Sequence, residues 1–133
     1  MSDDSEINAL PAVSHDEFER MRNANARSEL HRAIISLALT DADRAYVESA
    51  CIDLSQHRDE FVRGNAILAF GHLARRFGEL SRGCAQLIER GLTDPSAHVR
   101  AQAWAAADDV QFFLKWSIAG FTSAEAARQP GDA

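Results

Sequence analysis

The histidine side chains of this 133-residue chain could do acid–base or metal chemistry, but their spacing fits neither. No two of the five histidines lie four residues apart on one expected helix, as a His-Glu-x-x-His zinc motif requires. We expect His57 and His98 to be solvated turn residues. We expect His72 to lie on an exposed helix face near Arg75 and Arg76, either as a solvated face or as part of a binding surface. No phosphate-binding glycine loop, dinucleotide fingerprint or nucleophile elbow is present. The sequence therefore predicts a non-enzymatic protein with no cofactor and no metal.

The adjacent acids Asp108 and Asp109 interrupt an apolar helical pattern. Neighbouring side chains on a helix diverge by about 100°, which suits shared acid–base work poorly. The pair is either a solvated face or an acidic contact for a basic partner. Phe112, Phe113 and Trp116 follow within two turns. They either close one end of the fold or form an exposed anchor for a partner, because aromatic residues dominate binding hot spots.

Composition and charge exclude several classes of partner. The chain carries 14 Lys+Arg against 20 Asp+Glu, and 46% of it is hydrophobic, which is typical of one globular domain. Residues 1–20 hold six acids and one base, so residues 21–133 have a charge of only −1 and no basic footprint for nucleic acid. No stretch reaches the roughly 18 apolar residues of a membrane span. The acidic start does not resemble a signal peptide, so we expect a cytoplasmic protein. We expect Cys51 and Cys84 to be buried thiols.

Seven glycines, three prolines and the absence of period-two alternation predict an all-α chain with six main helices. Residues 1–13 are expected to be a flexible acidic leader, 14–121 a single helical domain and 122–133 a frayed tail. Capping and periodicity signals set the helix bounds. The expected helices cover residues 14–23, 27–39, about 41–55, a stretch ending at Gly78, a stretch ending at Gly91, and a last stretch capped by Asp94, opened by Pro95 and running to about Ser117.

Two segments of the chain repeat each other. Residues 57–69 align with residues 94–106 at an offset of 37. In both, Val-Arg is followed by Ala three residues later and by a second Ala three residues after that: Val62-Arg63 in the first and Val99-Arg100 in the second. The helices ahead of these segments also match in outline. Each unit is therefore expected to be a helix, a short turn and a second helix that opens near Val-Arg.

This pattern resembles the HEAT-repeat family, in which a helix, an Asp/Pro-containing turn and a Val-Arg helix recur. Asp94-Pro95 with Val99-Arg100 matches the pattern well, and Val62-Arg63 matches it behind a turn that has no Asp-Pro. The resemblance covers residues 41–114. Residues 14–39 have the right length for a first, degenerate repeat but lack Val-Arg.

The resemblance implies a short right-handed α-solenoid of about three helical hairpins. It also implies that Arg63 and Arg100 are structural and pair with Asp59 or Asp94 in a ladder between repeats. Stacked hairpins offer a binding surface lined by the second helix of each pair. The candidates for that lining are Asn65, His72, Arg75 and Arg76 on the fourth helix, and Gln102, Asp108, Asp109 and Phe112 on the sixth.

The expected partner is another protein, with no role for nucleic acid or a membrane, and the protein itself is expected to be a monomer or weak dimer. The most concrete expectation is a small bacterial immunity or inhibitor protein that neutralises a toxin with a basic surface. One alternative is an adaptor or regulatory subunit of a larger complex. Another is a cofactor-handling protein like the HEAT-like bilin lyases. A DNA-glycosylase function would need a positive groove, which the nearly neutral body does not supply.

Overall fold

The computed structural model describes residues 12–122, and these form six α-helices with no strand. The predicted all-helical class is therefore confirmed for this part of the chain. The expected leader and tail lie almost wholly outside the described residues. None of the described helices is both long enough and apolar enough to cross a membrane. The helices are α2 (His15–Ala24), α3 (Arg27–Thr40), α4 (Arg44–Leu54), α5 (Glu60–Phe77), α6 (Cys84–Leu92) and α7 (Ala97–Leu114).

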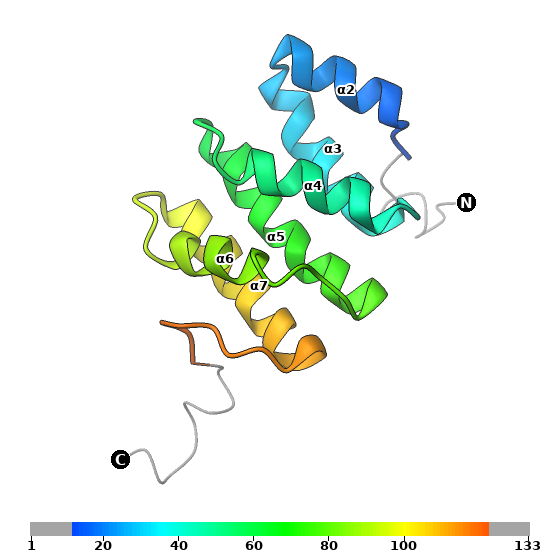
Figure 1. Cartoon of the computed structure of the whole chain (residues 1–133). Coiled ribbons are helices and arrows are strands. Elements are labelled where there is room, and N and C mark those ends of the chain that lie inside the picture. Colours follow the sequence, from blue (N-terminus) through cyan, green and yellow to red (C-terminus); the bar gives the residue numbers. More distant parts are fainter. Residues whose placement is uncertain (1–11, 123–133) are drawn as a thin grey trace, which may run out of the picture.

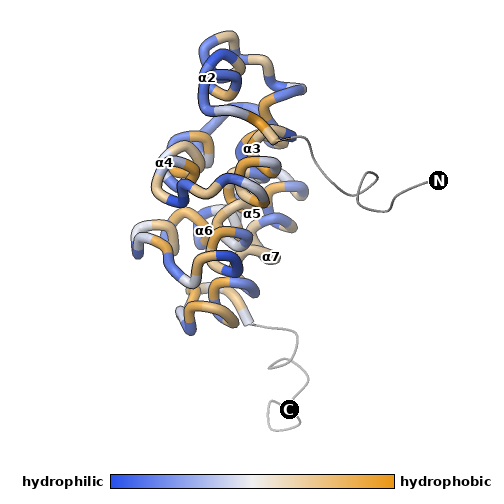
Figure 2. Tube along the Cα trace, turned by 90° about the vertical axis from the view of Figure 1, so that its right-hand side faces the viewer, coloured by the Kyte–Doolittle hydropathy of each residue, from blue (hydrophilic) through white to orange (hydrophobic). Residues whose placement is uncertain are grey.

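The helices form three successive hairpins, α2–α3, α4–α5 and α6–α7 (Figure 1). The second helices α3, α5 and α7 lie side by side, and the first helix of each hairpin packs against its own second helix. In the perpendicular view, α4 and α6 form one layer and α3, α5 and α7 form the other (Figure 2). The second-helix layer therefore carries most of the packing between hairpins.

Small residues let α5 and α7 approach closely. Val62 and Val99 are fully buried, as are the Ala residues that follow each of them. A Cβ atom on Gly71 would lie 2.7 Å from Asp109 Oδ2 and 3.2 Å from the Ala106 Cα atom of α7. Real Cβ atoms need more room than this, so Gly71 is required for the observed helix separation. The hydrophobic core lies between the layer of first helices and the layer of second helices.

Side-chain caps fix where most helices begin. Ser14 caps α2 by accepting a hydrogen bond from the Glu17 N–H, which confirms the predicted N-cap, and the Ser14 hydroxyl donates to Glu17 Oε1. The predicted start at Asp94-Pro95 is wrong. Ser96 caps α7 instead, and Asp94 lies in the preceding turn, where it accepts a hydrogen bond from the Ser96 N–H.

The last helix ends at Leu114, before the predicted Ser117, because Lys115 adopts a left-handed conformation (φ 59°) and turns the chain. Residues 115–122 then run beneath α6 and α7 (Figure 1). Trp116 and Ile118 are buried there, and the Ala119 N–H donates to Glu89 Oε2 at 3.0 Å. This closing segment, residues 115–122, covers part of the end of the fold.

Candidate functional site

The two Val-Arg motifs occupy equivalent places. Each Val is the third residue of its helix, α5 or α7. Arg63 Nη1 donates to the carbonyl oxygens of His57 and Arg58 at 3.0 and 3.1 Å. Arg100 Nη1 donates to the carbonyl oxygens of Asp94 and Pro95 at 2.8 and 3.0 Å. Both guanidinium groups are thus held by the turn that precedes their own helix.

Arg63 also joins the second hairpin to the third. Its Nε and Nη2 atoms donate to the two carboxylate oxygens of Asp94, both at 2.8 Å. This bidentate pair holds the pKa of Asp94 below its usual value and raises the pKa of Arg63. The prediction that Arg63 is structural and pairs with Asp94 is confirmed. Arg100 is also structural, as predicted, because it is held by the Asp94 and Pro95 carbonyl groups, but the predicted pairing with a carboxylate is wrong among residues 12–122.

His57 occupies the position in the second hairpin that Asp94 occupies in the third, two residues before the N-cap of the second helix. Its Nδ1 accepts from the Asp59 N–H at 2.9 Å, and its Nε2 lies 2.9 Å from Asn25 Oδ1 in the α2–α3 connection. With Nδ1 accepting, Nε2 is the ring nitrogen that faces the Asn25 oxygen as a donor. His57 lies in a turn, as predicted, but it is half-buried and joins two hairpins rather than being fully solvated.

A polar bridge crosses the second-helix layer at Asn65. Its side chain is only 8% exposed. Its Nδ2 donates to the His31 carbonyl of α3, and its Oδ1 accepts from Gln102 Nε2 of α7, both at 2.9 Å. His98 is half-buried, with Nε2 3.3 Å from Asn65 Oδ1, and its ring centroid lies 4.9 Å from that of Phe61. Asn65 and Gln102 were predicted to line a free surface, and His98 to be solvated. The structure instead places all three between helices.

Of the remaining residues predicted to line the surface, Arg76 joins two hairpins and the others stay at least partly accessible. Arg76 donates to the Ala38 carbonyl of α3 at 2.7 Å, so its guanidinium joins the first hairpin to the second. His72 is half-buried rather than fully exposed, and burial together with Arg75 lowers the pKa of its imidazole. Five predicted residues remain near one accessible region at the C-terminal ends of α5 and α7. This α5–α7 patch comprises His72, Arg75, Asp108, Asp109 and Phe112.

Asp109 is the chemically unusual member of the α5–α7 patch. Burial raises the pKa of its carboxyl group, the neighbouring Asp108 raises it further, and Arg75 opposes the change. The Asp109 carboxylate makes no hydrogen bond or ion pair within the described part of the chain. Gly71 leaves the space that this carboxylate occupies against α5. The patch therefore holds a half-buried anion that makes no ion pair among the described residues, although the charge of Arg75 acts on it.

Exposed aromatic rings lie beside these acids. Phe112 is 66% exposed and Phe113 39%, with ring centroids 4.8 Å apart. Lys115 Nζ lies 5.1 Å from the centroid of the Phe112 ring. Of the three aromatic residues that could close the fold, Trp116 does so and the two phenylalanines do not. They fit the alternative interpretation of an exposed anchor.

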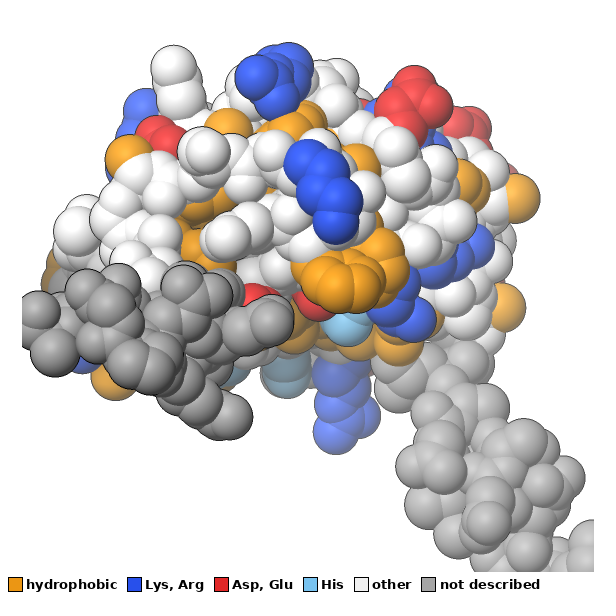
Figure 3. Space-filling model, turned by 90° about the horizontal axis from the view of Figure 1, so that it is seen from below, with side chains coloured by type: hydrophobic (Ala, Val, Ile, Leu, Met, Phe, Trp, Pro, Cys, Tyr) orange, Lys and Arg blue, Asp and Glu red, His pale blue; other side chains and the backbone are white. Residues whose placement is uncertain are grey.

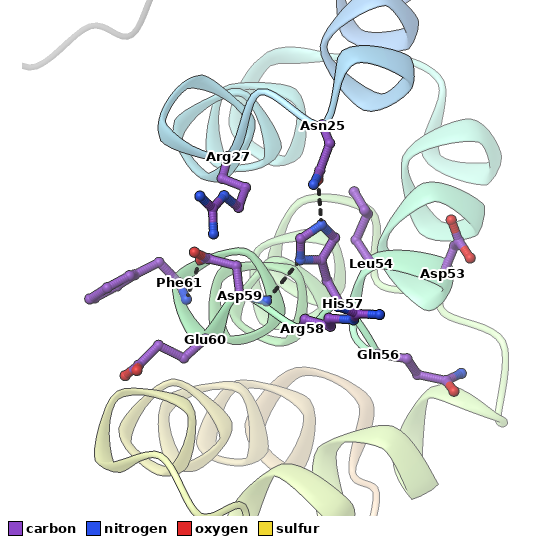
Figure 4. Close-up of a pocket in the computed structure, with 10 residues that line it drawn as sticks. All are labelled: Asn25, Arg27, Asp53, Leu54, Gln56, His57, Arg58, Asp59, Glu60 and Phe61. Carbon is purple, nitrogen blue, oxygen red and sulfur yellow. Dashed lines mark hydrogen bonds between the residues drawn. The ribbon is translucent and has the colours of Figure 1, made fainter.

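A hollow of about 780 Å³ lies at the opposite end of α5 (Figure 4). It is bounded by the α2–α3 connection at Asn25 and by the turn from Gln56 to Phe61. Its carboxylates already have partners: Asp59 caps α5, and Asp53 pairs with Arg22 at 2.7 Å. In residues 12–122 no group of His, Cys, Asp and Glu side chains could hold a metal ion. The hollow therefore provides no metal site among the described residues.

No sequence motif indicated a second polar cluster, which attaches α2 to α4. The His15 ring stacks on the Tyr46 ring with centroids 3.7 Å apart, and His15 Nε2 lies 2.9 Å from Asp41 Oδ2. The Tyr46 hydroxyl donates to Glu19. Burial and this hydrogen bond raise the pKa of Tyr46. The cluster has a structural explanation, because it holds the first helix against the second hairpin.

The comparisons with known proteins leave the family open. No family model matches the chain, and no curated protein or solved structure is significantly similar to it. The function is therefore inferred from the side chains themselves, and above all from the α5–α7 patch.

Proposed function

We propose that this protein is a non-enzymatic binding protein that holds another protein at the α5–α7 patch. The observation that carries this proposal is the half-buried, unpartnered carboxylate of Asp109, which lies beside Asp108 and the 66% exposed Phe112. Partial burial raises the free energy of this anion, although its oxygens still reach solvent, and an exposed aromatic ring is also costly. One cation set next to an apolar side chain on a partner would relieve both costs.

The partner that fits this chemistry has a basic, partly apolar surface. An Arg or Lys of the partner would pair with Asp109, and an apolar side chain would cover Phe112. The concrete form that we propose is a cytoplasmic inhibitor, such as an immunity protein, that neutralises a toxin by binding it. The nearly neutral body of the chain supports a protein partner over nucleic acid.

We further propose that the three hairpins are HEAT-like repeats in a short right-handed solenoid. The support is the equal register of Val62-Arg63 and Val99-Arg100 in their helices and the Arg63–Asp94 pair across the joint between hairpins. In this arrangement α2–α3 is a degenerate first repeat. The second-helix layer is then the binding surface, and the α5–α7 patch is its acidic end.

The test is a double charge reversal, Asp108→Lys with Asp109→Lys, in the full chain. The tagged protein is used to isolate its partner from the cells that produce it, and the affinity for the purified partner is then measured by calorimetry. We expect the reversal to weaken binding by at least about a hundredfold, because two attractive charge contacts become repulsive. The variant should keep the helical circular dichroism spectrum of the wild type.

The matched control reverses two exposed acids of the first hairpin, Asp16→Lys with Glu29→Lys. It makes the same change in net charge at sites remote from the patch, so a general charge effect would weaken both variants alike. Unaltered affinity in the Asp108/Asp109 variant would remove the patch from the binding site. Obligate co-purification with several subunits of one assembly would favour an adaptor over an inhibitor.

A further inference from the structure

We propose that Arg100 and the outer face of α7 dock a helix of the partner protein, and that the turn before that helix supplies a carboxylate to Arg100. This inference rests on the proposed function only in requiring a protein partner. It adds a second contact region, on the side of α7 that faces away from α5. It also states the chemistry of the partner segment that binds there.

The Arg63–Asp94 pair is the internal template for this contact. Arg63 is held by two carbonyl groups of its preceding turn and offers Nε and Nη2 to the carboxylate of Asp94, which lies in the turn before the next helix. Arg100 is held by the equivalent two carbonyl groups. Its Nε and Nη2 have no partner among the described residues. Arg100 therefore presents the same two donors, already positioned, with no carboxylate between them.

The face of α7 that accompanies Arg100 corresponds to the face of α5 that is covered by the third hairpin. At the repeat offset of 37, Ile67 corresponds to Trp104. Ile67 is 2% exposed and lies against Gly91 of α6, whereas Trp104 is 46% exposed. An indole at a position whose counterpart is a core residue is the kind of side chain that anchors an interface.

The closing segment covers part of the outer face of α7 and leaves part of it exposed. Phe121 packs edge-on against Trp104, with ring centroids 4.6 Å apart, and Trp116 and Ile118 are buried. Arg100, Ala101 and Asp108 remain exposed. Viewed from below, this end of the molecule brings hydrophobic side chains to the surface between basic ones (Figure 3).

A second copy of this chain does not fit the site. The glycines that let α7 approach α5, Gly64 and Gly71, are replaced on α7 by Ala101 and Asp108. A Cβ atom on Gly64 would lie 2.7 Å from the His98 ring of the third hairpin. Ala101 is the residue of α7 that corresponds to Gly64, and it carries this Cβ atom. If the third hairpin of a second copy packed on α7 as it packs on α5, its His98 would therefore clash with Ala101. Docking of the first hairpin would bring no acid to Arg100, because the α2–α3 connection consists of Asn25 and Ala26. The proposed occupant is therefore a different protein, which brings a carboxylate to Arg100.

The experiment places the photo-crosslinker p-benzoylphenylalanine in the full chain in place of Trp104, of Arg75 or of Phe61, and irradiates the producing cells. Trp104 reports on the outer face of α7, Arg75 on the α5–α7 patch and Phe61 on the remote hollow. We expect a crosslink from position 104 to a partner peptide in which Asp or Glu shortly precedes a helical segment. Replacing that acid by its amide should weaken the complex.

Arg100→Lys keeps the charge but removes the fork of two donors, so we expect the yield of the crosslink from position 104 to fall about tenfold. Arg58→Lys is the matched control, because Arg58 is exposed and its guanidinium has no partner among residues 12–122. The effect of the partner's acid-to-amide change should disappear in the Arg100→Lys background, since both changes remove the same contact.

Each other outcome overturns the inference. A crosslink from position 75 alone would refute it and leave the proposed function standing. A crosslink from position 104 to a second copy, or to residues 123–133 of the same chain, would identify a different occupant. A crosslink from position 104 that Arg100→Lys does not affect would refute the role of Arg100. The absence of crosslinks from both 75 and 104 would refute this inference and the proposed function together.

Discussion

The Arg63–Asp94 pair should be the main electrostatic joint between the second and third hairpins. The perturbation is a double-mutant cycle of Arg63→Gln, Asp94→Asn and both together. The two side chains are 19% and 14% exposed, and they share two hydrogen bonds of 2.8 Å. Glutamine and asparagine keep most of the volume of each side chain. The cycle therefore isolates the ionic fork from the packing around it.

The size of the coupling follows from geometry and burial. Exposed ion pairs contribute about 0.2–1 kcal/mol, and hydrogen bonds to charged groups contribute about 1.5–3 kcal/mol when buried. A bidentate, mostly buried pair lies between these limits, so we expect a coupling of about 1.5 kcal/mol. Each single variant should lose about 2 kcal/mol of unfolding free energy, because it leaves a partly buried charge without its partner.

The assay is urea unfolding followed by circular dichroism at 222 nm. The matched control is the same cycle on Arg22 and Asp53, which also lie 2.7 Å apart but with Asp53 70% exposed. Its coupling should stay below about 0.5 kcal/mol. If the Arg63–Asp94 coupling is no larger than that of the control, the pair does not join the hairpins and the template used for Arg100 is lost.

The same pair predicts a direction of pH dependence. Since the pKa of Asp94 is lowered in the folded protein, its contribution is fully present above the unfolded carboxyl pKa of about 4 and is lost as the pH falls through the lower, folded value. The stability difference between wild type and Asp94→Asn should therefore be constant near neutral pH and shrink below about pH 4. A difference that grew on acidification would contradict the assignment.

Two further measurements test the packing. Gly71→Ala should lower the free energy of unfolding in urea by about 1 kcal/mol, because crowding against the Ala106 backbone outweighs the gain of about 1 kcal/mol in helix propensity. Gly83→Ala is the control: no atom lies within 4 Å of the new Cβ atom, so this change should be neutral or slightly stabilising. Stabilisation by Gly71→Ala would refute the close approach of α5 and α7. Cys51 and Cys84 should be unreactive towards Ellman's reagent until the protein unfolds, because burial raises the pKa of each thiol to about 12. Fast reaction of either thiol in the native protein would contradict its burial.

Local signals predicted most of the helices. A cap or a breaker acts on the residues next to it, so Ser14 and Gly78 could be assigned from their neighbours alone. Asp94 shows where this reasoning stops. It has the right type and position for a cap, but Arg63, 31 residues earlier in the chain, holds its carboxylate, and Ser96 caps the helix instead.

The candidate surface was harder to predict than the helices. Asn65 and Gln102 are polar residues at one repeat position, which suggests solvent contact when each helix is considered alone. In the fold they bond to each other across α5 and α7, and Asn65 also bonds to α3. Two polar side chains at equivalent positions of neighbouring repeats can satisfy each other inside the layer. Helical periodicity does not distinguish this arrangement from exposure.

The joints between hairpins use one geometry with different chemistry. In both joints, the side chain two residues before the N-cap accepts a hydrogen bond from the backbone N–H of the N-cap residue. His57 Nδ1 accepts from Asp59 before α5, and Asp94 Oδ1 accepts from Ser96 before α7. The same side chain then bonds to the preceding hairpin, through a neutral contact with Asn25 in one case and the ionic fork of Arg63 in the other. The joint is therefore defined by where the acceptor lies and not by its residue type. At Arg100 half of a third joint is present, and a carboxylate supplied by a partner would complete it.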